Sequence, residues 1–119
     1  MIKLKRVYEE PSQDDGFRVL VEGLWPRGMS KENAHINLWL RDVAPSTGLR
    51  RWYRHDPSRW EEFRRRYWDE LREKEKFLDV LREKSQQGLV TFVFASRDVP
   101  HSGALALKEY LEKVAAKTQ

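Results

Sequence analysis

The pattern of apolar and polar positions divides the chain into strand-like and helix-like stretches. Residues 2–8 alternate between apolar and basic side chains, which predicts a strand near the edge of a sheet. Residues 17–21 read Phe-Arg-Val-Leu-Val and predict a second strand, because they are apolar and β-branched. Residues 89–95 form a continuous apolar run between Gly88 and a polar loop. A run without alternation is typical of a strand that is buried on both faces, in the middle of a parallel sheet.

The middle of the chain has helical spacing. Residues 37–43 and 47–53 predict two short helices. A longer helical pattern covers residues 59–87, and either one helix or two helices with a break near Lys74 would satisfy it. The segment Ser58-Arg59-Trp60-Glu61 predicts a capping box at its start. The apolar stripe of this pattern consists of Trp60, Phe63, Tyr67, Leu71, Leu78 and Leu81.

A last helix is expected to begin at Ser102 or Gly103. Its apolar positions are Leu105, Leu107, Tyr110, Leu111 and Val114. The order of elements is therefore strand, strand, helices, strand, helix, which is an α/β pattern. The 119 residues predict a single domain, residues 1–119. We expect a small parallel or mixed sheet of about three to five strands, with residues 89–95 central and helices on both faces.

Composition narrows the class of protein. Five Trp, five Phe and four Tyr favour a packed core although 35% of the residues are charged. The absence of Cys excludes disulfides and thiolate chemistry. The sequence has neither a signal-peptide pattern nor a run approaching the roughly 20 apolar residues of a membrane span. It therefore predicts a soluble cytoplasmic protein without a membrane partner.

The formal net charge of +4 allows attraction to phosphates or nucleic acid, but acidic residues are interspersed throughout. The run Arg64-Arg65-Arg66, followed by two aromatic residues, is the strongest nucleic-acid candidate. Acidic residues surround it at i±3 and i±4 spacing, which favours a solvated, salt-bridged helix face. Nucleic acid is therefore the less favoured partner.

Two turns that follow strands carry the candidate chemistry. Trp25-Pro26-Arg27-Gly28 comes after the second strand, and the polar loop 96–103 comes after the buried one. The carboxyl ends of parallel strands meet at one edge of a sheet, where ligands bind. We therefore expect both turns to line one pocket that favours anions.

Within these turns, four residues are candidate ligand contacts. The guanidinium of Arg27 presents donors in a fork suited to phosphate or carboxylate, and it can equally tie down its own loop. Gly28 lets the backbone approach a ligand closely. Trp25 is either a wall of the pocket or plain core. Arg97 is a further basic candidate in the second turn.

Asp98 and His101 are the catalytic candidates. Asp98 can orient His101, which can act as a general acid or base near neutral pH. The alternative is that Asp98 caps the loop and His101 is a solvated residue at the helix entrance. No nucleophile-elbow motif surrounds either neighbouring serine, so the pair supplies only part of a mechanism.

No metal or cofactor is predicted. His55 and Asp56, together with Asp98 and His101, are ligand types without a local ligand spacing. Asp56 followed by Pro57 is better explained as a turn before a helix. The sequence has no glycine-rich phosphate loop of the Walker or dinucleotide kind.

Five segments resemble the YeaO-like family, domain of unknown function 488: residues 21–28, 39–46, 55–57, 60–67 and 90–101. The resemblance runs through nearly the whole chain in the right order. It implies a small bacterial or archaeal cytoplasmic α/β protein and carries no activity with it. The turn that usually reads Asp-Arg-Leu-Trp-Pro-Arg-Gly begins here with Glu22 and Gly23, and His101-Ser102 stands where a His-Asn pair is usual.

The sequence leaves three functions open. The first is an enzyme or binding protein for an anionic small molecule, a class that includes nucleotide-like ones, at the C-terminal edge of the sheet. The second is a nucleic-acid-binding module that uses the arginine-rich helix, and the third is a protein-interaction module. The first two differ in whether the basic residues meet in a concave pocket or along a convex face. The oligomeric state stays open.

Overall fold

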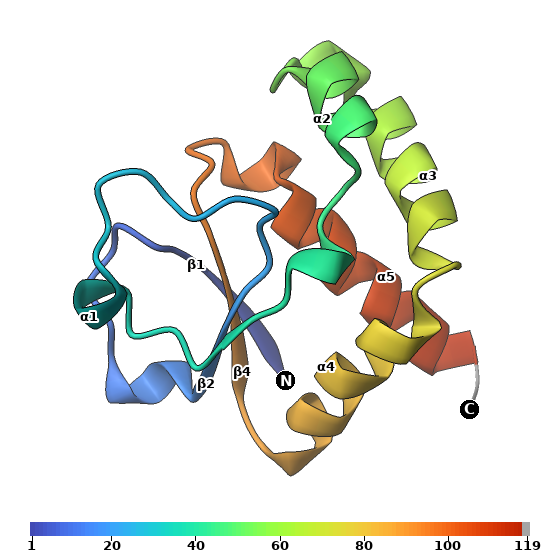
Figure 1. Ribbon diagram of the computed structural model, residues 1–119. Coiled ribbons are helices and arrows are strands. Elements are labelled where there is room, and N and C mark those ends of the chain that lie inside the picture. The colour runs from blue at the N-terminus through green and yellow to red at the C-terminus, as the bar shows by residue number, and fades with distance from the viewer. Residues whose placement is uncertain (118–119) are drawn as a thin grey trace.

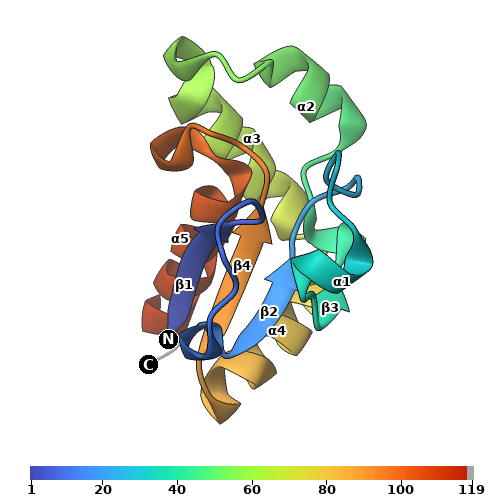
Figure 2. The ribbon, with the colours of Figure 1, turned by 90° about the vertical axis from the view of Figure 1, so that its left-hand side faces the viewer.

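A four-stranded, fully parallel sheet forms the centre of the computed structural model (Figures 1 and 2). The structure describes the backbone of residues 1–117 and the side chains of residues 1–113. The strands are β1 (Ile2–Arg6), β2 (Phe17–Leu20), β3 (Leu38–Trp39) and β4 (Val90–Phe94), in the order β1-β4-β2-β3. The predicted central place of residues 89–95 and the edge place of the first strand are both confirmed.

Most of the helices lie on one face of the sheet. They are α2 (Thr47–Tyr53), α3 (Trp60–Leu71), α4 (Glu75–Gln87) and α5 (Gly103–Lys117). In Figure 1, α3, α4 and α5 lie to the right of the sheet, and the single-turn helix α1 (Lys31–Ala34) lies to its left. The expectation of helices on both faces therefore holds in part, because the second face is covered mainly by loops.

The main core lies between the sheet and the helices. Alternate residues of β4, namely Val90, Phe92 and Phe94, are buried against the predicted apolar stripe of α3 and α4. Leu107, Tyr110 and Leu111 of α5 complete the cluster, whereas the side chain of Val114 lies outside the described residues. The helical spacing of apolar residues thus correctly identified the faces that pack together.

The second face of the sheet contains a buried ion pair that the sequence did not suggest. The Arg18 guanidinium lies 2.6 Å from the Asp15 carboxylate, and the two residues are 3% and 1% exposed. Burial favours the neutral acid, but hydrogen bonds from the Ser12 amide, Lys5 and Arg18 outweigh it, so the pKa of Asp15 lies below its ordinary value of 3.8. Arg18 also donates to the carbonyls of His35 and Ala34, at 3.1 and 2.8 Å. The pair therefore connects β2 to the loops that cover it.

The prediction of a short helix over residues 37–43 is wrong in its first half. Leu38–Trp39 is strand β3, and only Arg41–Val43 forms a 3₁₀ turn. The amides of Asn37 and Leu40 donate to the carbonyls of Arg18 and Leu20, at 2.9 and 3.0 Å. Pairing with β2 therefore overrides the local helical spacing, as tertiary contacts commonly do in short segments.

The long helical pattern resolves into two helices, with the break over residues 72–74. The predicted capping box at Ser58 is wrong. Instead, the Asp56 carboxylate accepts hydrogen bonds from the amide and the hydroxyl of Ser58, at 3.0 and 2.7 Å, and a 3₁₀ turn over Pro57–Arg59 leads into α3. Asp56 caps this turn in place of Ser58, because the proline that follows it has a fixed φ that suits the first helical position.

Candidate functional site

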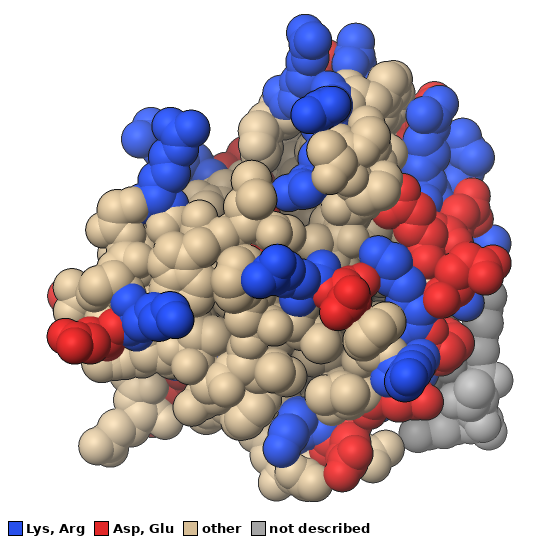
Figure 3. All heavy atoms as spheres, viewed as in Figure 1, with Lys and Arg blue, Asp and Glu red and all other residues tan. Residues whose placement is uncertain are grey.

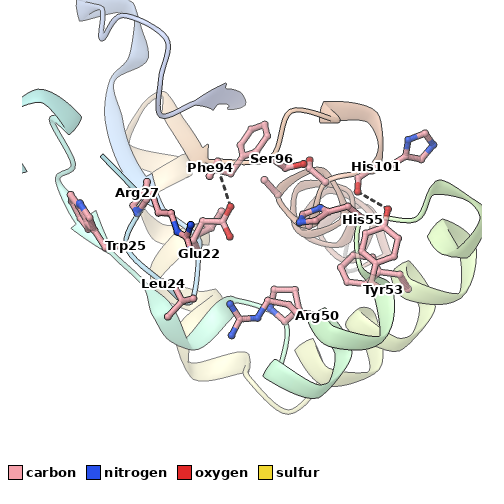
Figure 4. Close-up of a pocket in the computed structure, with 18 of the residues that line it drawn as sticks. Glu22, Leu24, Trp25, Arg27, Arg50, Tyr53, His55, Phe94, Ser96 and His101 are labelled. Atoms are coloured by element: carbon pink, nitrogen blue, oxygen red, sulfur yellow. Dashed lines mark hydrogen bonds between the residues drawn. The ribbon is translucent and has the colours of Figure 1, made fainter. Parts of the chain in front are cut away.

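A cavity of about 470 Å³ opens at the carboxyl ends of β2 and β4. One side is formed by the loop after β2, another by α2, and the third by the turn after β4 (Figure 4). The labelled lining residues in that view are Glu22, Leu24, Trp25, Arg27, Arg50, Tyr53, His55, Phe94, Ser96 and His101. The two turns that the sequence singled out therefore meet at one cavity.

Polar contacts hold the strand ends in place beside the cavity. The Glu22 carboxylate accepts a hydrogen bond of 3.0 Å from the Ala95 amide (Figure 4). The Arg6 guanidinium donates to the carbonyls of Ala95 and Ser96, at 3.1 and 3.0 Å. These contacts join the ends of β1, β2 and β4, so the cavity is largely pre-formed.

The turn containing Arg27 is fixed through its backbone. The Tyr8 hydroxyl donates to the Arg27 carbonyl at 2.9 Å, and the Trp25 indole donates to the Met29 carbonyl at 2.6 Å. Gly28 has a φ of +72°, a left-handed conformation that favours glycine. Arg27 itself is exposed at the cavity rim.

Trp25 satisfies both of the interpretations offered for it. It lines the cavity, and it also packs against the small second core of Val7, Ala34 and Val93. Its ring meets that of Trp39 edge-on, with centroids 5.5 Å apart. Trp25 is thus a wall of the cavity whose position is set by packing.

The turn after β4 contains the expected contact between Asp98 and His101. Nδ1 of His101 lies 2.8 Å from the Asp98 carboxylate, and the ring meets Trp60 edge-on at 5.6 Å. Neither Asp98 nor Trp60 lines the cavity. The carbonyl of His101 accepts a hydrogen bond of 2.8 Å from the Tyr53 hydroxyl (Figure 4).

The structure therefore brings together only part of the predicted set. Trp25, Arg27 and His101 line the cavity. Asp98 is attached to it through His101, whereas Gly28 and the exposed Arg97 are not among its lining residues. The roles assigned to these residues in binding or catalysis stay predictions.

The lining residues that the sequence did not assign to the site include Glu22, Arg50 and Tyr53. Burial raises the pKa of Tyr53 to about 12, and Asp98 and Asp56 add to the effect, so the phenol remains a hydrogen-bond donor. Arg50 and Tyr53 lie three residues apart on α2. This spacing places both side chains on one face of the helix, but no local signal in the sequence shows that this face meets the sheet edge.

Charged side chains are unevenly distributed over the surface. On the face shown in Figure 3, Lys and Arg predominate over the upper part near α2, whereas Asp and Glu gather on the right over α3, interleaved with basic groups. Arg64 pairs with Glu61 at 2.8 Å and with Glu109 at 3.7 Å, and Arg66 pairs with Glu62. The arginine-rich helix is therefore salt-bridged, as its spacing predicted.

Within the described part of the chain, no group of three or more His, Asp or Glu side chains is arranged to hold a metal ion. His55 lines the cavity, while the Asp56 carboxylate accepts a hydrogen bond from the Ser58 amide and so caps the 3₁₀ turn before α3. No helix among the described residues has the length and apolar character needed to cross a membrane.

The fold and cavity define a small parallel α/β protein with a pre-formed site at the carboxyl edge of its sheet. The chain belongs to the inactive DUF488-N3 subclade, whose family model matches residues 1–119. It is 42% identical over 110 residues to an uncharacterised protein of Mycobacterium tuberculosis, covering 92% of each chain. It is 31% identical over 113 residues to the uncharacterised protein YeaO of Escherichia coli, covering 95% of this chain and 98% of YeaO. No solved structure gives a significant match.

Proposed function

We propose that this protein binds an anionic, nucleotide-like small molecule in the cavity at the carboxyl edge of its sheet. The observation that carries the proposal is the presence of two arginines, Arg27 and Arg50, among the lining residues of a cavity of about 470 Å³. Neither forms an ion pair with a carboxylate among the described side chains. Pockets of this size accept metabolite-sized ligands, and ligands of open α/β sheets bind at this edge.

The start of α5 adds further donors for an anion. Gly103 and Ala104, the first residues of α5, line the cavity. The first amides of a helix have no intrahelical partner, and the helix dipole makes this end partly positive. The Ser102 hydroxyl accepts a hydrogen bond of 3.2 Å from the Leu105 amide, so the amides of Gly103 and Ala104 are left to a ligand.

The remaining walls suit a flat apolar body. Tyr53 stacks on Phe63 with ring centroids 4.1 Å apart, and both residues line the cavity together with Phe94 and Leu24. One oxygen of Glu22 is bonded to the Ala95 amide, and the other can accept from a ligand N–H. An anionic group joined to a planar ring that carries N–H donors matches this arrangement, and a nucleotide has both parts.

We favour binding without turnover. The family is described as inactive, which supports a binding role. The His101 ring lies between Asp98 and Trp60, and neither of these residues lines the cavity. The general acid–base role of Asp98 and His101 stays a separate prediction.

Isothermal titration calorimetry with adenosine 5′-monophosphate (AMP), supported by mapping of backbone amide NMR shifts, tests the proposal. We expect saturable binding, with the largest shifts at Gly103 and Ala104 and in the loop after β2. Arg27→Ala should weaken binding and leave the melting temperature unchanged, because an exposed arginine contributes little to folding. Arg97→Ala is the matched control, since Arg97 is also exposed and lies outside the cavity lining. Absence of binding by all four ribonucleoside monophosphates would overturn the proposal.

A further inference from the structure

Arg50 extends from α2 toward the loop after β2, and its guanidinium lies directly against the backbone of Gly23 in that loop. A β-carbon at residue 23 would stand 2.9 Å from Nη1 and 3.1 Å from Cζ and Nη2 of Arg50. Figure 4 shows the Arg50 guanidinium directed from α2 toward the loop that carries Glu22 and Leu24. Only a residue without a side chain leaves this space free, so Gly23 allows Arg50 to reach its position.

Arg50 uses few of its hydrogen-bond donors. Nη2 donates to the Thr47 hydroxyl at 3.2 Å, whereas Nε is buried and has no partner among the described residues. A guanidinium has five N–H donors in a rigid fork. Nε is closed off from solvent, so a bound oxyanion would accept from the remaining Nη donors of the fork and would stabilise the charge beside that unpaired donor.

We infer that Arg50, seated on Gly23, is the residue that binds the phosphate of the ligand, and that Arg27 has the lesser share. This inference rests on the proposed function and names the part of the site that recognises the anion. Arg50 is half-buried beside the apolar walls, while Arg27 is exposed at the rim. A charge-assisted hydrogen bond is stronger in the less polar surroundings, and salt and water screen the exposed charge more effectively.

A comparison of AMP with adenosine isolates the contribution of the phosphate. Arg50→Gln should weaken AMP binding at least about tenfold, because a hydrogen bond to a charged group is lost. Adenosine affinity should change by less than about twofold, since the walls that hold the ring remain. Arg51→Gln makes the same change in net charge on the exposed side of α2 and should leave both ligands unaffected. Arg50→Lys keeps the charge without the fork, so its AMP affinity should lie between those of the wild-type protein and Arg50→Gln.

Two glycine-to-alanine variants test whether Gly23 allows Arg50 to reach its position. Gly23→Ala should displace the guanidinium and weaken AMP binding while the protein stays folded, because the clash is with the end of a flexible side chain. Gly48→Ala on α2 meets no atom within 4 Å and should leave AMP binding unchanged. Far-ultraviolet circular dichroism and melting temperature confirm folding for each variant.

The outcomes separate the two proposals. If AMP binds the wild-type protein and Arg50→Gln has no effect, or weakens AMP and adenosine equally, the inference about Arg50 is overturned and the cavity remains the binding site. If Gly23→Ala binds AMP as the wild-type protein does, the free space at Gly23 is not needed for Arg50 to bind the phosphate. If AMP and the other three ribonucleoside monophosphates do not bind the wild-type protein, both proposals are overturned.

Discussion

The Glu22 carboxylate and the Ala95 amide, joined by a hydrogen bond of 3.0 Å, connect the loop after β2 to the end of β4. The last backbone contact between these two segments is the 3.2 Å bond from the Val21 amide to the Val93 carbonyl. Glu22 therefore continues the pairing by one step through its side chain, at the edge where the cavity begins. This contact sets how far apart the two site-bearing turns stand.

Replacement of Glu22 tests that connection. Glu22→Gln keeps an oxygen acceptor for the Ala95 amide and should be nearly as stable as the wild-type protein. Glu22→Ala leaves that amide without a partner and should lower the free energy of unfolding by about 1–2 kcal/mol. Urea denaturation measures the difference, and amide hydrogen exchange at Ala95 should accelerate in the alanine variant only. Equal stability of the two variants would show that the contact does not hold the edge.

The buried Asp15–Arg18 pair should make stability depend on acidic pH. The pKa of Asp15 is lowered from 3.8, so its contribution is present above that value and is lost as the pH falls through the lower folded pKa. Asp15→Asn leaves Arg18 buried without its partner and should cost about 3–5 kcal/mol at neutral pH. This difference from the wild-type protein should shrink as the pH drops below 3.8.

The matched control for that experiment is Asp14→Asn. Asp14 is the exposed neighbour, and its side chain has no ion pair among the described residues. Its substitution should change stability by less than about 0.5 kcal/mol at either pH. Chemical denaturation at pH 7 and at pH 3 supplies all the values. A pH-independent loss in Asp15→Asn would mean that the cost comes from packing and not from charge.

The end of α2 offers a stabilising substitution. Arg54 has a φ of 50° at the C-cap of α2, and an exposed side chain. A left-handed conformation at this position favours glycine, so Arg54→Gly should raise stability by about 0.5–1 kcal/mol. Arg51→Gly, inside the same helix, should lower it by about 1 kcal/mol. Thermal unfolding distinguishes the two signs, and a loss in both variants would contradict the proposed relief of strain.

The elements with long or uninterrupted patterns could be predicted from the sequence. The run over residues 89–95 correctly predicted a central strand, because a strand that is buried on both faces lacks the alternation of apolar and polar positions. The stripe of Trp60, Phe63 and Tyr67 correctly predicted the buried face of α3. The convergence of the two turns followed from topology, since parallel strands end at one edge.

The features that could not be predicted depend on contacts distant in sequence. Leu38–Trp39 is too short for its spacing to identify it, and it becomes a strand by pairing with β2. Arg18 lies only three positions from Asp15, but the loop residues that accept its other hydrogen bonds, His35 and Ala34, are distant in sequence. Arg50 lies 27 positions from the residue that its guanidinium contacts, Gly23, so no local pattern could place it in the cavity.

His101 decides between a binding protein and an enzyme. Its ring contacts Asp98 and Trp60, and its carbonyl, which survives any side-chain substitution, accepts from Tyr53. His101→Ala should therefore leave the AMP affinity within about twofold of that of the wild-type protein. It should lower the free energy of unfolding by at most about 1 kcal/mol, because the Asp98–His101 contact is partly exposed. Phosphorus NMR of AMP that has been incubated with the wild-type protein and then separated from it should show no new resonance if the site only binds. A new resonance that disappears in both His101→Ala and Asp98→Asn, with AMP affinity retained, would establish the general acid–base role and refute binding without turnover. Persistence of such a resonance in both variants would assign the chemistry to other residues of the cavity.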